Sequence, residues 1–307
     1  MAFSTTPFAA WKYSQLTKKE WKISNPQFEG DRFCPMYRSW PWNGHRRFAY
    51  DLVRFKKPKR IVELGTYWGT SFFAFCQAVK DFKLTTESIA IDTWDGDDHT
   101  GKYDPEAFEI FSRIKNQLFS DINIHVLKMR FEEALSDIDD CSIDLLHIDG
   151  CHEYDAVKKD FESWLPKLME NGIVFFHDIA DDVDYGSVRF WKEISSKFPS
   201  FSFQHSWGLG VLLPKGQKWL KQMEQNNIYD KIKIYEYLSE LDLTNIKLRN
   251  IDNLSRKRDS LIKTQEKEIE SLEIRLKDLE IELNRIRNSR RGKLAMRLGL
   301  IKLLREV

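Results

Sequence analysis

Short apolar segments alternate with helical segments between residues 46 and 215, and this alternation restricts the fold more than any other feature of the sequence. Helices between strands are expected for parallel βαβ units, in which helices cover both faces of one sheet. Two further apolar segments would add an antiparallel pair at one edge. The sequence therefore predicts an α/β fold with a doubly wound, mostly parallel sheet of seven strands. The predicted strands are residues 60–64, 88–92, 122–127, 143–149, 173–176, 201–203 and 208–213.

The segments outside this pattern differ in composition. Residues 1–45 are rich in aromatic residues, among them Trp11, Trp21 and Trp40, and we expect them to form an N-terminal cap of irregular structure. Residues 46–215 would form the sheet domain. Residues 216–250 would then form a helical connector.

Residues 251–290 have the pattern of a coiled coil. Leu and Ile recur there in alternating steps of three and four among Glu, Lys and Arg, and no Pro or Gly occurs from 251 to 291. A helix packed on its own domain would also show an apolar stripe, but the charged remainder favours a partner helix. We therefore expect a homo-oligomer. The predicted seam consists of Ile262, Ile269, Leu272, Leu276, Leu279, Leu283 and Ile286, with Gln265 as its polar member.

The 307 residues include 48 basic and 47 acidic side chains, but the two kinds are segregated. Residues 285–307 contain eight Lys or Arg and one Glu, so the rest of the chain has an acidic excess. This balance argues against a nucleic-acid partner. The basic, apolar tail at 291–307 has two interpretations that the sequence leaves open: peripheral contact with anionic lipid, or a frayed or oligomer-packing helix.

The cysteines and the apolar segments bear on the compartment. The four cysteines have neither C-x-x-C spacing nor the density of a disulfide framework, which favours a reduced compartment. The first residues lack the pattern of a signal peptide, and no apolar run is long enough to span a bilayer. We expect a cytoplasmic protein, either free or peripheral at the inner membrane face.

Acidic residues lie at the carboxyl ends of four of the predicted strands. They are Glu63, Asp92, Asp149 and the Asp of the pair His177-Asp178. Ligands of open parallel sheets bind beyond the carboxyl ends of the strands, and four acids there would be costly without a role. The sequence therefore predicts a functional site at this edge of the sheet.

The turn after the first strand has the sequence Glu-Leu-Gly-Thr-Tyr-Trp-Gly-Thr-Ser, from Glu63 to Ser71. Gly65 permits a tight turn and Gly69 permits close approach of a ligand at the start of a helix. The pattern is neither the G-x-G-x-x-G dinucleotide motif nor a phosphate-binding loop. Asp92 after the second strand is placed to bind a ribose diol. Together these acids suit a cofactor with a ribose and a positively charged end.

These motifs resemble the S-adenosylmethionine site of class I methyltransferases, in particular the catechol O-methyltransferase branch. The segment from His147 to Asp178, HIDGCHEYDAVKKDFESWLPKLMENGIVFFHD, is similar to a family of bacterial methyltransferases found with surface-glycan and glycosyltransferase genes. The resemblance runs from about Gly44 to Val211, over half the chain. It implies a Rossmann-like fold and S-adenosylmethionine as cofactor.

The resemblance also implies roles for particular residues. It places the methionine part of the cofactor near four residues of the first turn, the ribose at Asp92, and the adenine near Arg130 in the segment 129–131. The four residues of the first turn are Glu63, Gly65, Thr66 and Gly69.

In the metal-dependent branch, acids that end the fourth and fifth strands hold magnesium or another divalent cation and the acceptor oxygens. Asp149 and Asp178 occupy these positions. Ile179 stands where a third ligand is common, which departs from the pattern, and His177 would be a ligand or an acceptor contact. His152 coincides with the catalytic lysine of the catechol enzymes. An imidazole there suits a general base near neutral pH.

Other interpretations remain open. Either His152 or His177 would also serve as a structural side chain at a strand end, and His205 is a further candidate for the acceptor pocket. His147, Asp149 and His152 form an H-x-D-x-x-H pattern, a loose match to the iron site of a non-haem oxygenase, but this leaves the cofactor motif unexplained.

The preferred prediction is an S-adenosylmethionine-dependent O-methyltransferase. Its acceptor would be a hydroxyl of a sugar in a bacterial surface glycan or of a glycosylated small molecule. The alternative from another class is a non-catalytic assembly protein that recruits glycosyltransferases through its coiled coil.

Overall fold

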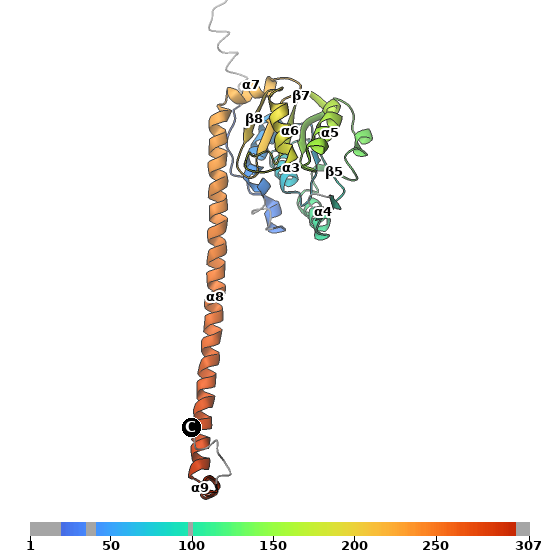
Figure 1. Ribbon diagram of the computed structural model, residues 1–307. Coiled ribbons are helices and arrows are strands. Elements are labelled where there is room, and N and C mark those ends of the chain that lie inside the picture. The colour runs from blue at the N-terminus through green and yellow to red at the C-terminus, as the bar shows by residue number, and fades with distance from the viewer. Residues whose placement is uncertain (1–19, 35–40, 98–100, 299–307) are drawn as a thin grey trace, which may run out of the picture. The chain divides into compact units, whose positions relative to one another are not determined.

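The computed structural model describes residues 20–34, 41–97 and 101–298 (Figure 1). The chain divides into two units, residues 1–244 and residues 245–307. The long helix α8, Ile228–Asn288, begins in the first unit and continues through the second. The boundaries that the sequence analysis placed at residues 45, 215, 250 and 290 stay predictions.

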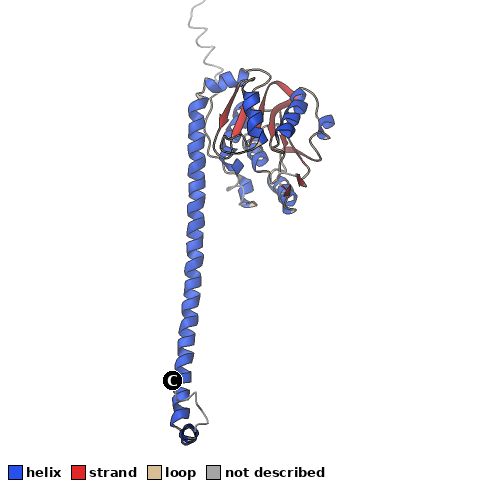
Figure 2. Ribbon diagram, in the orientation of Figure 1, coloured by secondary structure: helices blue, strands red, loops and turns tan. Residues whose placement is uncertain are grey.

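Seven strands form one sheet in the order β5-β2-β1-β6-β7-β9-β8 (Figure 2). Strands β5, β2, β1, β6 and β7 are parallel, whereas β9 runs antiparallel to both β7 and β8. The predicted fold class is therefore confirmed: the domain is Rossmann-like with a mostly parallel sheet. The strands are β1 (Arg60–Leu64), β2 (Glu87–Asp92), β5 (Asn123–Lys128), β6 (Ile143–Ile148), β7 (Leu168–His177), β8 (Ser200–Phe203) and β9 (Leu209–Leu212).

Two details of the strands differ from the expectation. Strand β7 begins at Leu168 rather than at Ile173, because the buried Leu168 already pairs with Ile143 of β6. A two-stranded hairpin, β3 (Gly96–Asp97) with β4 (Gly101–Lys102), follows β2 and was not predicted, since its glycines give no apolar pattern.

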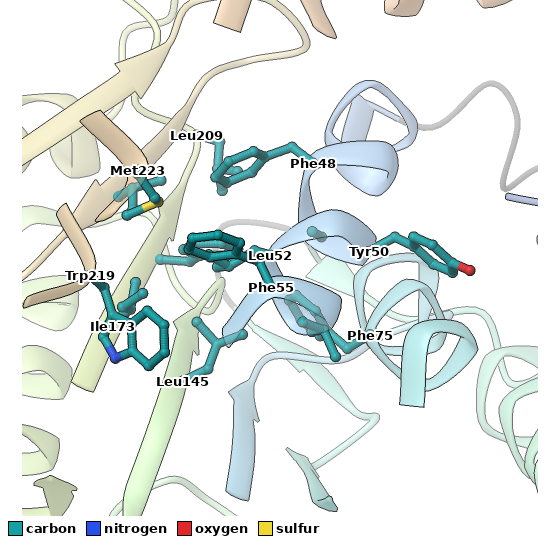
Figure 3. Close-up of a cluster of buried hydrophobic side chains, with 14 of the residues drawn as sticks. Phe48, Tyr50, Leu52, Phe55, Phe75, Leu145, Ile173, Leu209, Trp219 and Met223 are labelled. Atoms are coloured by element: carbon teal, nitrogen blue, oxygen red, sulfur yellow. The ribbon is translucent and has the colours of Figure 1, made fainter. Parts of the chain in front are cut away.

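Helices cover both faces of the sheet in the first unit. Leu145 and Leu146 of β6 point to opposite faces, because side chains alternate along a strand, and both are fully buried. Leu145 packs with α2, α3 and α7, as Figure 3 shows, and Leu146 packs with α5 and α6. The helices of this unit are α2 (Arg46–Lys56), α3 (Thr70–Asp81), α4 (Glu106–Leu118), α5 (Tyr154–Trp164), α6 (Gly186–Ser195), α7 (Lys218–Glu224) and the start of α8.

The described part of the N-terminal segment contains one short 3-10 helix, η1 (Glu29–Arg32), and a second one, η3 (Pro41–His45), leads into α2. Trp21 and Trp42 are buried. Trp11 and Trp40 lie outside the described residues. In the tail, α9 (Arg290–Arg297) follows α8, while residues 299–307 lie outside the described part. None of the described helices has the length and apolar character needed to cross a bilayer.

A buried chain of hydrogen bonds joins the N-terminal segment, α2 and the start of α8. The Trp21 indole N–H donates to Tyr235 Oη at 2.8 Å, and the Tyr235 hydroxyl donates to Asp51 Oδ2 at 2.6 Å. The Ser24 backbone N–H donates to the same carboxylate oxygen at 2.9 Å. Asp51 is fully buried, and the two donors to its Oδ2 offset part of the cost of burying the carboxylate.

Replacing Tyr235 with Phe keeps the buried ring and removes one donor to Asp51. We expect the free energy of unfolding to fall by about 1–3 kcal/mol, because a buried carboxylate loses a hydrogen bond. Urea unfolding followed by tryptophan fluorescence measures this. Tyr237→Phe on the same helix is the matched control, since Tyr237 is 64% exposed. Equal effects of the two substitutions would contradict the importance of the Tyr235–Asp51 bond.

Candidate functional site

Two neighbouring cavities lie at the carboxyl ends of the central strands. The β6–β7 cavity, of about 320 Å³, is lined by Asp149, His152, His177 and Asp178 together with aromatic side chains. The β2 cavity, of about 330 Å³, is lined by residues that include Asp92 and Arg130. Gly65, Tyr103 and Gly150 line both cavities, so the two cavities adjoin at these residues.

Gly65 brings the end of β1 against the end of β6. Its φ of +85° lies in the left-handed region, and a Cβ atom there would approach the Asp149 carbonyl oxygen to 2.0 Å. The Gly65 N–H donates to Ile91 of β2 at 3.0 Å, and the Asp149 N–H donates to Leu64 at 2.9 Å. Only glycine fits this conformation and this contact. Gly69, with a φ of +86°, precedes α3.

Asp92 organises the turn between β1 and α3. Its Oδ2 accepts hydrogen bonds of 2.8 Å from the backbone N–H groups of Thr66 and Tyr67, and its Oδ1 accepts one of 2.8 Å from that of Trp94. Burial raises the pKa of Asp92, although these three N–H groups act in the opposite direction. The carboxylate thus lies at the edge of the β2 cavity, where the sequence predicted a ribose-binding acid.

Thr66 and Arg130 also line the cavities, as their predicted roles require. Thr66 faces the β6–β7 cavity, and its buried hydroxyl oxygen has no hydrogen-bond partner in the described part of the chain. Such a polar atom fits a site that receives a polar ligand. Arg130 and Phe131 line the β2 cavity, and a Cβ atom at Gly150 would lie 2.5 Å from the Phe131 ring.

Glu63 lies behind the cavity walls rather than in them. Its Oε2 is 2.8 Å from His147 Nδ1, and both side chains are fully buried. The Trp42 indole N–H donates to His147 Nε2 at 3.2 Å, so the imidazole carries its proton on Nδ1 and donates it to Glu63. Burial raises the pKa of Glu63, although His147 lowers it. Both nitrogens of His147 are thus engaged, which leaves none for an iron site with Asp149 and His152.

Four charged side chains gather at the ends of β6 and β7. His152 Nε2 lies 2.7 Å from Asp178 Oδ2, and His177 Nδ1 lies 3.2 Å from Asp178 Oδ1 and 3.4 Å from Asp149 Oδ1. The other ring nitrogen of His177 donates to the Ser206 carbonyl oxygen at 3.2 Å. If both ring nitrogens of His177 carry a proton, each N–H therefore has a hydrogen-bond acceptor: the carboxylates for Nδ1 and the Ser206 carbonyl oxygen for Nε2.

The electrostatics of this cluster follow from its geometry. Burial lowers the pKa of His177, but the charges of Asp178 and Asp149 outweigh it and raise the value to about 10. Burial also lowers the pKa of His152, which Asp178 and Asp149 nevertheless hold above its usual range. The pKa of Asp178 is well below its usual range, since His177 and His152 overcome the effect of burial. At neutral pH the cluster therefore holds an ionised Asp178 beside a charged His177.

Part of this cluster has the donor atoms and spacing of a metal site. One ligand atom from each of Asp149, His152 and Asp178 lies within 4.8 Å of the other two. Carboxylate oxygens with an imidazole nitrogen suit a divalent cation bonded at about 2.0–2.6 Å, and such bonds span this spacing. Asp149 and Asp178 are thus placed together as predicted. His177, the third predicted ligand, is ion-paired with both carboxylates.

Sequence reasoning missed the aromatic wall of the β6–β7 cavity. Tyr185 stacks on His152 with ring centroids 5.0 Å apart, and Trp207 approaches Tyr185 edge-on at 6.5 Å. Tyr67 and Tyr103 also line this cavity, and their ring centroids are 4.0 Å apart. These residues lie in turns and loops, where no regular spacing of apolar residues identifies them. Gly208 after Trp207 was the one sequence feature that indicated a turn there.

The turn that carries Trp207 is held by histidines. Ser206, Trp207 and Gly208 all have left-handed φ values, of 53°, 64° and 86°. The Ser206 carbonyl oxygen is 3.2 Å from ring nitrogens of both His45 and His177. His205, predicted as an acceptor contact, instead donates to the Gly44 carbonyl oxygen at 3.1 Å. The strained turn thereby presents Trp207, which is 44% exposed, to the cavity.

Part of this chain, including most of these residues, is similar to a known protein family. Residues 62–179 match the model of a family described as a methyltransferase domain. A protein of Sinorhizobium fredii, uncharacterized protein y4gI, is 45% identical over 174 residues, which cover 56% of this chain. The match covers 19% of that protein's length, so this chain corresponds to about a fifth of it.

Solved structures of similar fold include three methyltransferases. The S-adenosylhomocysteine-bound methyltransferase PaMTH1 of Podospora anserina is 15% identical, covers 70% of this chain and 99% of its own, and gives a TM-score of 0.48. The O-methyltransferase of Bacillus cereus has 13% identity, coverage of 67% and 97%, and a TM-score of 0.46. The O-methyltransferase TomG of Streptomyces achromogenes has 16% identity, coverage of 68% and 96%, and a TM-score of 0.41.

The matched segment contains the strand-end residues of both cavities, from Gly65 and Asp92 to Asp149 and Asp178. Residues 62–179, which carry these strand ends, therefore match a methyltransferase domain.

Proposed function

We propose that this chain is an S-adenosylmethionine-dependent O-methyltransferase. The observation that supports it most directly is the junction of the two cavities at Gly65, Tyr103 and Gly150. A cofactor with its ribose at Asp92 would pass Gly65 and extend its methyl group toward Asp149. The acceptor would then occupy the β6–β7 cavity.

The chemistry of the transfer assigns a task to each group. The bond from the methyl carbon to sulfur breaks as the bond to the acceptor oxygen forms, and the hydroxyl proton has to leave. A divalent cation held by Asp149 and Asp178 would lower the pKa of that hydroxyl. His152 accepts the proton on its imidazole, which faces the cavity beside Asp178. His177 lies between the two carboxylates, and its single positive charge offsets part of their negative charge.

The aromatic wall favours a ring-shaped acceptor. Tyr185 and Trp207 offer flat apolar surfaces to the β6–β7 cavity, and Asp149 and His152 offer polar atoms to the same space. A sugar ring combines an apolar C–H face with hydroxyl groups and so suits both kinds of surface. We therefore include the sugar of a surface glycan or a glycosylated metabolite as the acceptor class of this proposal.

Calorimetry with S-adenosylmethionine and S-adenosylhomocysteine tests the cofactor, and mass spectrometry of candidate glycosides incubated with the protein and S-adenosylmethionine tests the transfer. We expect saturable binding of both nucleosides and the mass gain of one methylene unit on the acceptor. Absence of cofactor binding at millimolar concentration would refute the proposal and leave the non-catalytic assembly role.

Gly65→Ala tests the junction of the two cavities. A methyl group there meets the Asp149 carbonyl oxygen, so we expect S-adenosylhomocysteine affinity to fall by at least about tenfold. Gly101→Ala is the control, because Gly101 also has a positive φ, of 73°, but a Cβ atom there has open space. Unchanged affinity in Gly65→Ala would place the cofactor elsewhere.

Asp149→Asn and His152→Gln separate the metal site from the base. With Mn²⁺ as the probe, we expect Asp149→Asn to lower cation affinity roughly tenfold or more because an anionic ligand is lost. Asp155→Asn, an exposed acid on α5, should leave it unchanged. His152→Gln should instead lower the methyl-transfer rate roughly 10²–10⁴-fold with Mn²⁺ affinity retained. Loss of Mn²⁺ affinity in His152→Gln would identify His152 as a metal ligand. Full methyl-transfer activity of the unmodified protein in excess chelator would exclude a role for the metal.

The titration of His152 in the metal-free protein provides a separate test. Asp178 and Asp149 stabilise its charged form, so its pKa lies above the ordinary 6.5. The neutral, proton-accepting form therefore appears only as the pH rises above that ordinary value. NMR of the imidazole should show the raised pKa, and Asp178→Asn should bring it down. A pKa below 6.5 in the unmodified protein would contradict the Asp178 contact.

A further inference from the structure

The second unit contains a long helical stripe of exposed apolar side chains. Helix α8 places Ile269, Leu272, Leu276 and Leu279 along one side at successive steps of three and four residues. Their exposed fractions are 55%, 57%, 61% and 56%. Side chains of this kind gain about 1.5–3 kcal/mol each when they are fully buried. The stripe is therefore a surface that lacks its partner in the single chain.

The stripe has the narrow geometry of a coiled-coil seam. With Ile262 at position a of a heptad, the a positions are Ile262, Ile269, Leu276 and Leu283, and the d positions are Gln265, Leu272, Leu279 and Ile286. A seam of two positions per heptad is narrower than the broad apolar face of a helix that packs on a globular core or lies in a lipid interface. The heptad of Ile269 and Leu272, with Ile at a and Leu at d, favours two strands, whereas the heptad of Leu283 and Ile286 has the opposite order.

Charges beside the seam identify a second copy of this chain as the partner. In a parallel pair, each g residue lies near the e residue of the next heptad in the other helix. Arg275 at g then faces Glu280 of the second copy, and Glu282 at g faces Arg287 of the second copy. Because the two chains are identical, each of these attractions occurs twice across the dimer.

An antiparallel pair would lose this complementarity, since it places e against e and g against g. Four successive e positions are acidic, so in an antiparallel pair acidic side chains would face each other along most of the seam. In the parallel pair, one kind of contact brings like charges together, that of Glu268 with Glu273 of the other copy. The same acids would repel an anionic lipid surface. The acidic e positions are Asp259, Glu266, Glu273 and Glu280.

Gln265 sets the register. It occupies a d position that would be buried in the dimer, where an amide requires hydrogen bonds. In register, the two Gln265 side chains lie opposite each other and each amide donates to the other's oxygen. A shift of one heptad would place each amide against Leu272 instead, and it would lose that partner.

We propose that residues 262–286 form a parallel, in-register, two-stranded coiled coil with a second copy of this chain. The two methyltransferase domains then join the same, N-terminal end of the coil, because both chains enter it from residue 245. The basic residues from 290 to 297 of both copies follow its other end.

Cysteine cross-linking of the full chain tests orientation and register together. Gln265→Cys and Leu279→Cys, both at d and two heptads apart, should each form an interchain disulfide under mild oxidation. In an antiparallel pair, at most one of these two positions lies next to the same position of the other copy. In a parallel pair that is shifted in register, neither position does. Lys267→Cys at f is the control, and the unmodified protein accounts for the four native cysteines. Failure of either d position, or equal cross-linking at Lys267, would overturn the proposal.

Light scattering of full-length variants tests the seam without cysteines. Leu276→Lys should reduce the mass of the particle from two chains to one. Ile274→Lys is the matched control, because Ile274 is 59% exposed, close to the 61% of Leu276, but lies at f. Circular dichroism confirms that both variants stay folded. A monomeric unmodified protein, or equal loss of mass in both variants, would refute the dimer, whereas a monomer that binds anionic vesicles through Leu276 would replace it with a lipid contact.

Discussion

The contact between Gly65 and the Asp149 carbonyl is the constraint on which the site depends. It joins the ends of β1 and β6 with no side chain between them, and hydrogen bonds from Gly65 to β2 and from Asp149 to β1 hold the three strand ends together. A larger residue would separate the β2 cavity from the β6–β7 cavity. The proposed transfer from a cofactor to an acceptor needs the two cavities to adjoin, and the contact of Gly65 with the Asp149 carbonyl brings their walls together.

Histidines perform two different tasks behind this junction. His147 lies between Trp42 and Glu63 and is not among the residues that line the two cavities. His177 is charged between Asp149 and Asp178 and also holds the Ser206 carbonyl of the strained turn. One imidazolium therefore links the charge of the acidic cluster to the position of Trp207. The aromatic wall of the β6–β7 cavity and the carboxylates of Asp149 and Asp178 are thus mechanically connected.

The sheet and the acids at its edge were predictable from the sequence for a physical reason. Buried parallel strands are continuous apolar runs, so their ends, and therefore Asp92, Asp149 and Asp178, are visible in the sequence. The pairing of Glu63 with His147 was not predictable, because it depends on the register between β1 and β6. This pairing removes the Glu63 side chain from the cavity. The aromatic wall was also hidden, since loops such as the turn at Trp207 acquire their positions from distant hydrogen bonds.

Asp92 has a consequence for how ligand affinity arises in this protein. Its carboxylate already binds the N–H groups of Thr66, Tyr67 and Trp94, so the turn after β1 is ordered before any ligand arrives. A ligand that enters therefore loses little free energy to the ordering of the protein backbone. In the proposed function, the same carboxylate would both order the turn and bind the ribose of the cofactor. An alanine at this position would release the turn as well as remove a contact, and the resulting loss of affinity would exceed the strength of the single hydrogen bond that a ribose makes.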